Sequence, residues 1–352
     1  MLSHFKGSLL FTALALSLGG WLGWQMTGNI IGALGVVWIC FVLSILEVSL
    51  SFDNAAVNAT VLKDMDPVWQ QRFLTWGIAI AVFGMRIVFP LMIVAIAAQL
   101  GPIDAFRLAI DKPDEYARIL NDAHIGLMGF GGAFLGMVGL KYFFDSDKEV
   151  SWIAAIEEPL KKVASIQAIE IGILLLAIYG TSLMLPPADA LTFIVSGILG
   201  LLTFIGVEII GHVLEAPDGT TGMVAKSGLA SFLYLEVLDA SFSFDGVIGA
   251  FALTTNLFII AIGLGIGAMF VRSMTIYLVK KGTMSEYRFL EHGAFYAIIA
   301  LAAIMFISTS QHIPEVVTGF IGAVLIGLAF WSSLRWNRVN PEGEREEADA
   351  TA

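Results

Sequence analysis

Two short stretches of this 352-residue chain repeat one another, and both place carboxylates inside long apolar segments. The first stretch, at 47–54, reads EVSLSFDN, and the second, at 239–246, reads DASFSFDG. Glu47 aligns with Asp239, and Asp53 aligns with Asp245, at a constant offset of 192 residues (239 minus 47). An Asp at the centre of a membrane helix costs about 2.5–3.5 kcal/mol on insertion scales. Because the chain carries these costly carboxylates at matching positions in two segments, we predict one functional site built from two halves.

The residue types predict that this site binds a hard cation through oxygen ligands. Polar or small residues share one face of each segment at helical spacing: Glu47, Ser51, Asn54 and Asn58 in the first, and Glu236, Asp239, Ser243 and Gly246 in the second. Carboxylate, amide and hydroxyl oxygens suit Mg²⁺, Ca²⁺ or Mn²⁺, whereas zinc sites usually contain His or Cys. The predicted metal ligands are Glu47, Asp53, Asn54, Glu236, Asp239, Ser243 and Asp245.

Two of these ligands do not lie on the shared face. In a regular helix Asp53 and Asp245 point about 120° away from it. They reach the same site only if each helix is broken there, or else they face a neighbouring helix. Ser-x-Ser followed by Asp-Asn or Asp-Gly is a sequence that tolerates such a break, because these side chains compete for backbone hydrogen bonds.

Two arginines, Arg86 and Arg272, occupy the apolar segments that follow the two motifs, and we interpret them as counter-ions. They cannot neutralise all seven intramembrane carboxylates, so the excess must be protonated, hydrated or bound to a cation. Besides the motif residues, the acidic members of this set are Glu170 and Glu208. Glu208 and His212 lie one helical turn apart, which fits either an interfacial pair or a proton relay.

The composition predicts an all-α membrane protein. Hydrophobic residues make up 57% of the chain and charged residues 14%, against about 25% charged residues in soluble domains. Ten apolar segments are long enough to be predicted as membrane spans: 8–25, 30–62, 73–100, 124–143, 163–185, 189–214, 228–254, 257–279, 290–309 and 316–334. The second segment exceeds one straight crossing, which predicts a break or a strong tilt.

The basic residues predict the orientation. With ten spans, 14 of the 19 Lys and Arg residues fall on the side of the N-terminus, whereas three fall on the other side: Arg107, Lys112 and Arg118. The positive-inside rule then places both termini in the cytoplasm. Since no clear Ala-x-Ala cleavage site follows the first apolar stretch, we expect an uncleaved first span in the cell (inner) membrane.

The motifs fall in the second and seventh spans, which run in opposite directions. That arrangement predicts an inverted-topology repeat with a 3+3 core, as in many secondary transporters. The predicted units are a first helix at 1–29, a first repeat at 30–143, a cytoplasmic segment with two connecting helices at 144–227, a second repeat at 228–309, a last helix at 310–334 and a disordered tail at 335–352. A surface helix is expected near 152–160.

Other functions are disfavoured by the sequence. A net charge of −11 argues against nucleic acid as a partner, and the single Cys40 excludes an intramolecular disulfide. No Gly-x-x-x-x-Gly-Lys motif indicates nucleotide binding, and no Gly-x-Gly-Asp signature supports an intramembrane aspartyl protease. We therefore expect no enzyme and no resident cofactor. The expected partners are metal ions and the lipid bilayer, while the oligomeric state stays open.

The motif residues resemble those of the TerC-type integral membrane family. Glu47-x-x-x-Ser51-x-Asp53-Asn54 is similar to that family's Glu-Leu-x-Leu-Ser-x-Asp-Asn motif. Glu236-x-x-Asp239 followed by Asp245 is similar to its second motif, and Arg272-Ser273 fits its pattern. The stretch 290–293, LEHG, is similar to a divergent and largely uncharacterised branch of the family. The chain departs from the pattern at Gly246, where the family has Ser, and at Ile248, where Pro often follows.

The resemblance implies metal transport across the cell membrane, with manganese export as the expected role and tellurium resistance as the historical one. It places the carboxylates of both motifs along the metal path, and their protonation offers a means of coupling export to a proton gradient. The alternative is a membrane scaffold or stress-resistance protein of the tellurium type, in which the carboxylates are structural.

Overall fold

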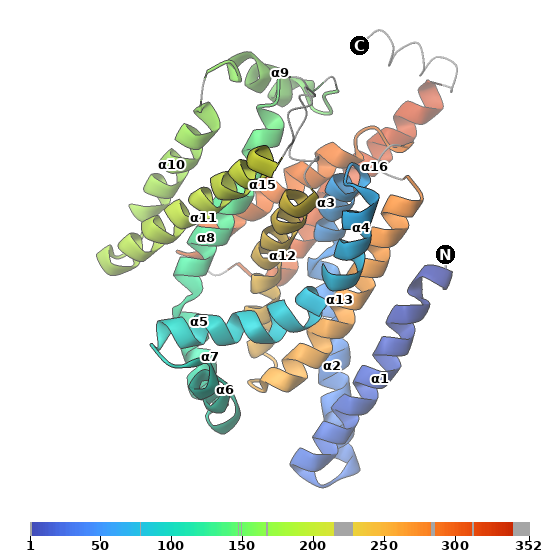
Figure 1. The fold of residues 1–352 in the computed structure, drawn as a ribbon, viewed down its shortest axis with the longest axis vertical. Coiled ribbons are helices and arrows are strands. Elements are labelled where there is room, and N and C mark those ends of the chain that lie inside the picture. The colour runs from blue at the N-terminus through green and yellow to red at the C-terminus, as the bar shows by residue number, and fades with distance from the viewer. Residues whose placement is uncertain are drawn as a thin grey trace.

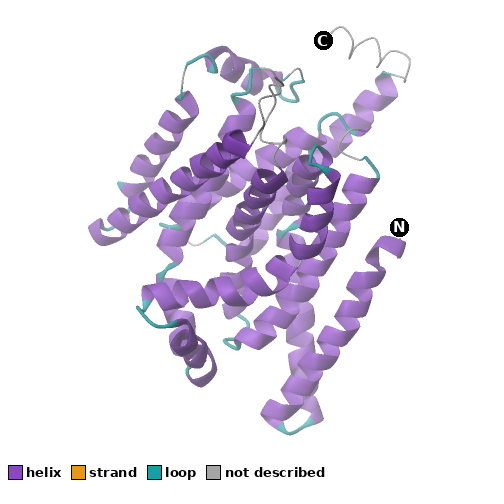
Figure 2. Ribbon diagram, in the orientation of Figure 1, coloured by secondary structure: helices purple, strands orange, loops and turns teal. Residues whose placement is uncertain are grey.

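A computed structural model describes residues 2–340 apart from 78, 147, 149, 167, 215–227, 283–285 and 312, and of the side chains it also leaves out 2–4, 214, 244, 245, 315 and 316. Within this part the chain is all helical, with fifteen α-helices and two π-helical segments (Figures 1 and 2). The bounds are α1 Leu2–Thr27, α2 Ile30–Leu50, α3 Phe52–Lys63, α4 Pro67–Arg72, η1 Phe73–Gly77, η2 Ile80–Val88, α5 Phe89–Ala97, α6 Pro102–Asp111, α7 Pro113–Asp122, α8 His124–Phe143, α9 Ala154–Val163, α10 Ile169–Ser182, α11 Pro187–Leu214, α12 Gly228–Phe251, α13 Leu257–Lys280, α15 Leu290–Ser308 and α16 Glu315–Val339.

The membrane prediction is confirmed, with fewer spans than expected. Eight helices of the described part are long and apolar enough to cross a bilayer. Two of the ten predicted spans are not among them. The α10 helix has only 14 residues, and α12 has 24 residues but carries Glu236, Asp239 and Asp245. The protein is thus an integral membrane protein with about eight spans. The inverted repeat and the orientation in the membrane remain predictions.

The long second span is broken, as its length predicts. The α2 helix ends at Leu50 and α3 begins at Phe52, with Ser51 between them at φ −106° and ψ 17°. The break falls within the first acidic motif, so Glu47 belongs to the end of one helix and Asp53 to the first turn of the next. No corresponding break interrupts the backbone of α12, which runs from Gly228 to Phe251.

The third predicted span contains the π-helical segments. Five residues of η1 and nine of η2 have this rare geometry, which in other proteins is concentrated at functional sites. The α5 helix continues η2 and runs across the lower part of the bundle in Figure 1. Residues 101–123 form the two surface helices α6 and α7.

The surface helices and the ends of the long helices lie at different heights along the long axis of the molecule (Figure 1). In Figure 1 the C-terminal end of α16 and the surface helix α9 lie toward the upper part of the molecule, and the start of α1 lies near mid-height. The α1–α2 turn, α6 and α7 lie toward the lower part. The predicted surface helix near 152–160 corresponds to α9. The last helix extends to Val339, so 335–339 are helical where a disordered tail was predicted, and Arg338 in its last turn suits the helix dipole. The rest of that tail, 341–352, lies outside the described residues.

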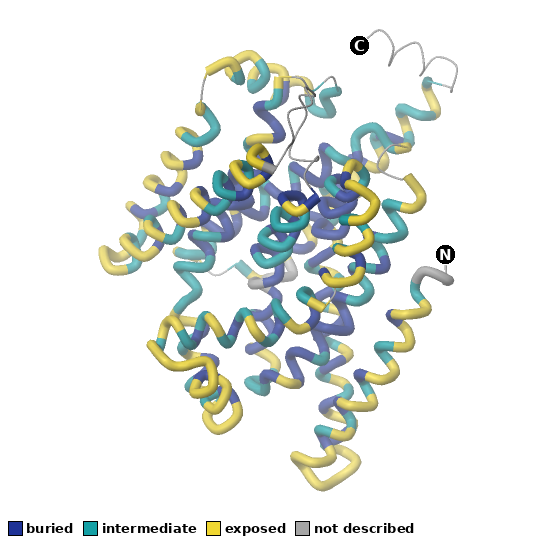
Figure 3. The backbone as a smooth tube through the Cα atoms, viewed as in Figure 1, coloured by how far each residue is buried: buried dark blue, intermediate teal, exposed yellow. Residues whose placement is uncertain are grey.

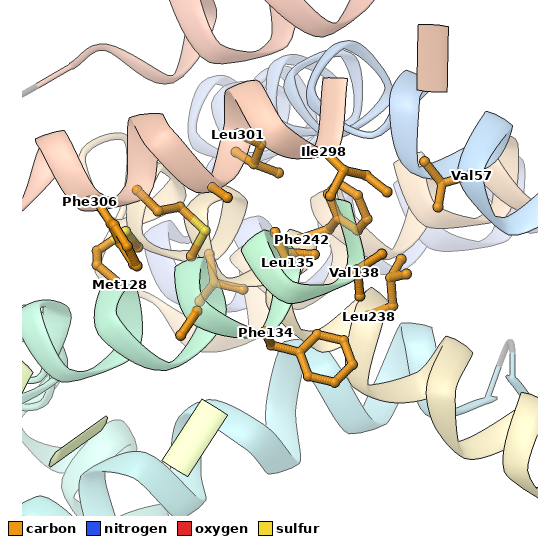
Figure 4. Close-up of a cluster of buried hydrophobic side chains, with 14 of the residues drawn as sticks. Val57, Met128, Phe134, Leu135, Val138, Leu238, Phe242, Ile298, Leu301 and Phe306 are labelled. Carbon is orange, nitrogen blue, oxygen red and sulfur yellow. The ribbon is translucent and has the colours of Figure 1, made fainter. Parts of the chain in front are cut away.

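The most buried helices form the centre of the bundle. Two-thirds of the apolar stretch of α8 and of α15 is buried (67% each), compared with 17% for α1 (Figure 3). Helix α8 packs closely because it is rich in glycine. A Cβ on Gly129 would lie 2.8 Å from the carbonyl oxygen of Phe193 on α11, so only a glycine allows this approach. Figure 4 shows the core cluster where α8, α12 and α15 meet: Phe134, Leu135 and Val138, Leu238 and Phe242, and Ile298 and Leu301.

Candidate functional site

The two acidic motifs meet at a small internal cavity of about 40 Å³. Its walls come from α2, α3, the π-helical segments, α12 and α13, and its lining residues are Glu47, Asn54, Asn58, Phe73, Leu74, Gly77, Ala81, Arg86, Glu236, Asp239, Ala268, Val271, Arg272 and Thr275. One water needs roughly 10–15 Å³ on this scale. The cavity therefore has room for a few waters or for one ion with part of its hydration.

Glycines of α13 position the first motif. A Cβ on Gly267 would lie 2.4 Å from the Cβ of Glu47, and a Cβ on Gly263 would lie 2.5 Å from the Cβ of Leu43. The Gly-x-x-x-Gly spacing thus forms a groove that lets α2 approach the backbone of α13. These two glycines were not among the predicted site residues, although a Gly-x-x-x-Gly spacing in an apolar helix indicates close helix packing.

The first-half carboxylate Glu47 is neutralised internally. Arg86 of η2 donates to Glu47 Oε1 and to the carbonyl oxygen of Ala81, and both members of the ion pair are 2% exposed. The hydroxyl of Ser51, at the helix break, donates to the same Oε1 at 3.0 Å. The prediction that Arg86 is a counter-ion agrees with this contact. Breaking such a buried pair costs about 3–5 kcal/mol, because one charge remains without compensation.

One hydrogen bond joins the two motifs directly. The side-chain amide of Asn54 on α3 donates to Asp239 Oδ1 on α12 at 2.6 Å. The Oδ1 of Asn54 is then buried without a partner among the described residues, and so is the Oδ1 of Asn58 one turn further along α3. Both residues line the cavity, so two carboxamide oxygens are available there as acceptors.

The second-half carboxylates are less compensated. Glu236 lines the cavity beside Gly77, and its Oε1 has no hydrogen-bond partner in the described structure. Arg272, the predicted counter-ion, donates to the carbonyl oxygen of Leu74 on η1 and forms no ion pair with a carboxylate among the described side chains. Its neighbour Ser273 bonds Ser8 of α1 at 2.7 Å.

Two predicted ligands, Asp53 and Ser243, do not line this cavity. Asp53 is 4% exposed and lies against α16, where a Cβ on Gly322 would be 2.7 Å from Asp53 Oδ2. Its Oδ1 accepts the backbone N–H of Asn54 at 2.9 Å, in the first turn of α3, where a negative charge suits the helix dipole. Ser243 is buried with its hydroxyl unpartnered, away from the cavity lining. The side chain of Asp245 lies outside the described residues. Metal binding by these three stays a prediction.

A cation in this cavity would need mixed ligands. No group of three His, Cys, Asp or Glu side chains in the described part is close enough to hold a metal ion. Carboxamide oxygens, carboxylate oxygens and water would have to act together, which is the ligand type of hard cations.

A second charged cluster, which was not predicted from the sequence, lies near the C-terminal end of α8 and the N-terminal end of α15. Glu157 of α9 is 1% exposed and is contacted by Lys148 at 2.9 Å, by His292 at 3.4 Å and by the N–H of Ile153 at 3.0 Å. Burial raises the pKa of Glu157, but the hydrogen bonds from His292, Ile153 and Lys148 outweigh it and hold the pKa well below its usual value. Burial lowers the pKa of Lys148, and Glu157 opposes that shift. No signal in the sequence marks Glu157 as buried.

Two further pairs concern residues singled out by sequence. Glu208 forms an ion pair with Lys141 of α8 at 3.0 Å, and Glu291 forms one with Lys63 at the end of α3 at 2.6 Å. Both pairs are partly exposed. The Glu208–Lys141 contact agrees better with an interfacial role for Glu208 than with a relay. Glu170 lies in the first turn of α10, away from the cavity.

Comparison with known proteins identifies a family. The model of the family described as protein of unknown function (DUF475) matches residues 52–340, so the chain belongs to that family. No curated protein and no solved structure matches the chain. The resemblance to the TerC-type family is not part of this match.

Proposed function

We propose that this member of the DUF475 family is a transporter, not an enzyme, and that it moves a divalent cation across the membrane. One observation carries the proposal. Among the described residues, unpartnered side-chain oxygens from α3 and α12 face one small cavity inside a bundle of apolar helices. Buried oxygens without partners are costly, and a bound cation compensates that cost.

The available ligands define the class of substrate. They are the carboxamide oxygens of Asn54 and Asn58 and the carboxylates of Glu236 and Asp239. Such donors suit Mg²⁺, Ca²⁺ and Mn²⁺. Manganese is the expected substrate because the motifs resemble those of the TerC-type family. Glu47 contributes charge to the cavity, but Arg86 already holds its Oε1.

The broken helix supports transport over static binding. The helix ends at Leu50 and Phe52 interrupt a segment at membrane depth, as the discontinuous helices of transporters do. Export of a divalent cation against an inside-negative potential costs about 4.6 kcal/mol per 100 mV, since each charge costs about 2.3 kcal/mol. Protons entering through the same carboxylates are the expected compensating flux.

The test is Mn²⁺ flux in proteoliposomes that contain the purified full chain. Saturable flux should occur with the wild type and be lost in the double variant Glu236→Gln/Asp239→Asn. The matched control is Asp104→Asn, because Asp104 lies on the surface helix α6 and outside the cavity lining. Absence of flux above empty vesicles for Mn²⁺, Mg²⁺ and Ca²⁺, with the protein folded, would overturn the proposal.

The second candidate is a membrane scaffold or stress-resistance protein. The observation that favours it is the Glu47–Arg86 pair, which is internally complete and needs no ligand. A scaffold would retain its partners in the Glu236→Gln/Asp239→Asn variant and show no flux in either form. Co-purification of the wild type and of this variant separates the two candidates.

A further inference from the structure

The two intramembrane arginines of the described structure have different partners, although both line the same cavity. Arg86 is 2% exposed and holds the carboxylate of Glu47. Arg272 is only half-buried and donates to a backbone carbonyl, that of Leu74. The Nε of Arg272 is buried and unpartnered in the described structure, as is the Oε1 of Glu236. A guanidinium and a carboxylate thus face one small cavity, and in the described structure they do not form an ion pair with each other.

The charges of the cavity lining show what this arrangement does. Three carboxylates, from Glu47, Glu236 and Asp239, face two guanidinium groups, which leaves a net charge of −1 when all are ionised. The Glu47–Arg86 pair is neutral by itself. The part of the cavity that can accept a cation therefore holds two carboxylates and the single positive charge of Arg272.

We propose that Arg272 is a tethered cation that competes with the transported divalent ion for Glu236 and Asp239. The inference rests on the proposed function and assigns a selectivity role within the same site. In the described structure Arg272 donates to the Leu74 carbonyl and is not paired with these carboxylates, and Asp239 accepts a hydrogen bond from Asn54. In the competing state the guanidinium moves onto the two carboxylates and neutralises them.

Competition with a resident charge favours divalent ions. A cation binds only if its attraction to the two carboxylates is stronger than the attraction of the guanidinium to them. Coulombic attraction rises with the charge of the ion, so a divalent ion displaces Arg272 more readily than a monovalent one. Arg272 is in this sense a specificity-determining residue, whereas Arg86 is a positioning residue for Glu47.

The experiment measures Mn²⁺ binding to the purified full chain by electron paramagnetic resonance. Arg272→Gln should bind Mn²⁺ more tightly than wild type, by about tenfold, because a unit positive charge has been removed from the lining of the same cavity. Arg272→Lys should show a smaller increase, since it keeps the charge on a shorter side chain. Arg107→Gln, an exposed α6 variant outside the cavity, is the matched control and should not differ from wild type.

A second readout separates competition from a structural role. Free guanidinium ion at low millimolar concentration should weaken Mn²⁺ binding to Arg272→Gln and leave the wild type unaffected. Equal or weaker Mn²⁺ binding by a folded Arg272→Gln overturns the inference. If that variant does not fold, the Lys variant decides in the same way. Absence of Mn²⁺ binding in the wild type and in both Arg272 variants would overturn the proposed function as well, whereas binding only in the variants would support the competition.

Discussion

The two halves of the cavity differ in how completely their charges are compensated. In the first half Glu47 has a guanidinium and a hydroxyl partner, and its helix is seated against the glycines of α13. In the second half Glu236 and Asp239 are half-buried, and among the described residues Asn54 donates a hydrogen bond to Asp239 whereas Oε1 of Glu236 has no partner. The two related motifs therefore differ in role. One half is organised as a rigid support and the other keeps its acceptors available for a ligand.

The largest effect should follow from breaking the compensated half. Arg86→Gln leaves the Glu47 carboxylate buried without its counter-ion, or forces it to bind a proton, and should cost about 3–5 kcal/mol of stability. Thermal unfolding in detergent measures this. The double variant Arg86→Gln/Glu47→Gln should recover part of the loss, because neither charge remains. A double variant as unstable as the sum of the two single variants would show that the pair does not matter as a pair.

An intermediate effect is expected at the charged cluster around Glu157 of α9, where the carboxylate is compensated by several partners. Glu157→Gln should destabilise the protein by about 1–3 kcal/mol at neutral pH, since a charged acceptor of several hydrogen bonds is lost. The pKa of Glu157 is lowered by folding, so its contribution is present above its unfolded value of 4.5 and is lost as the pH falls toward the folded pKa. Unfolding curves of the two proteins should therefore converge in acid. A difference that is constant with pH would contradict the charge-based account.

The smallest effect on stability should come from removing one of the unpartnered oxygens that line the cavity. Asn58→Ala removes an oxygen that has no hydrogen bond in the described structure, so the free energy of unfolding should change by less than about 1 kcal/mol. The same substitution should weaken Mn²⁺ binding by a clear factor, since the lost oxygen is a proposed ligand. Denaturation and Mn²⁺ titration of one preparation test both statements. A large loss of stability with unchanged binding would assign Asn58 to the support instead.

Much of this arrangement was predictable from sequence, because membrane burial makes polar residues conspicuous. Helical spacing placed Glu47 and Asn54 on one face, and the length of the second span predicted a break or a strong tilt, which the structure shows to be a break at Ser51. The partner of Arg272 was not predictable, since a backbone carbonyl leaves no trace in the residue types. The position of Asp53 against Gly322 of α16 depends on tertiary packing that periodicity does not contain. Ten spans were predicted and eight helices meet the length and composition expected of a span. The difference arises at α10, which is short, and at α12, which contains three carboxylates.

The positions of the cavity contacts along the chain also set the order in which the protein is made. Glu47 and Arg86 are 39 residues apart, so their segments leave the ribosome in close succession and can enter the bilayer as a neutral pair. Asn54 and Asp239 are 185 residues apart. Their contact cannot form until α12 has been synthesised, and the cavity is therefore a late product of biogenesis. A chain interrupted before α12 would contain the Glu47–Arg86 pair but neither Asp239 nor the glycines of α13.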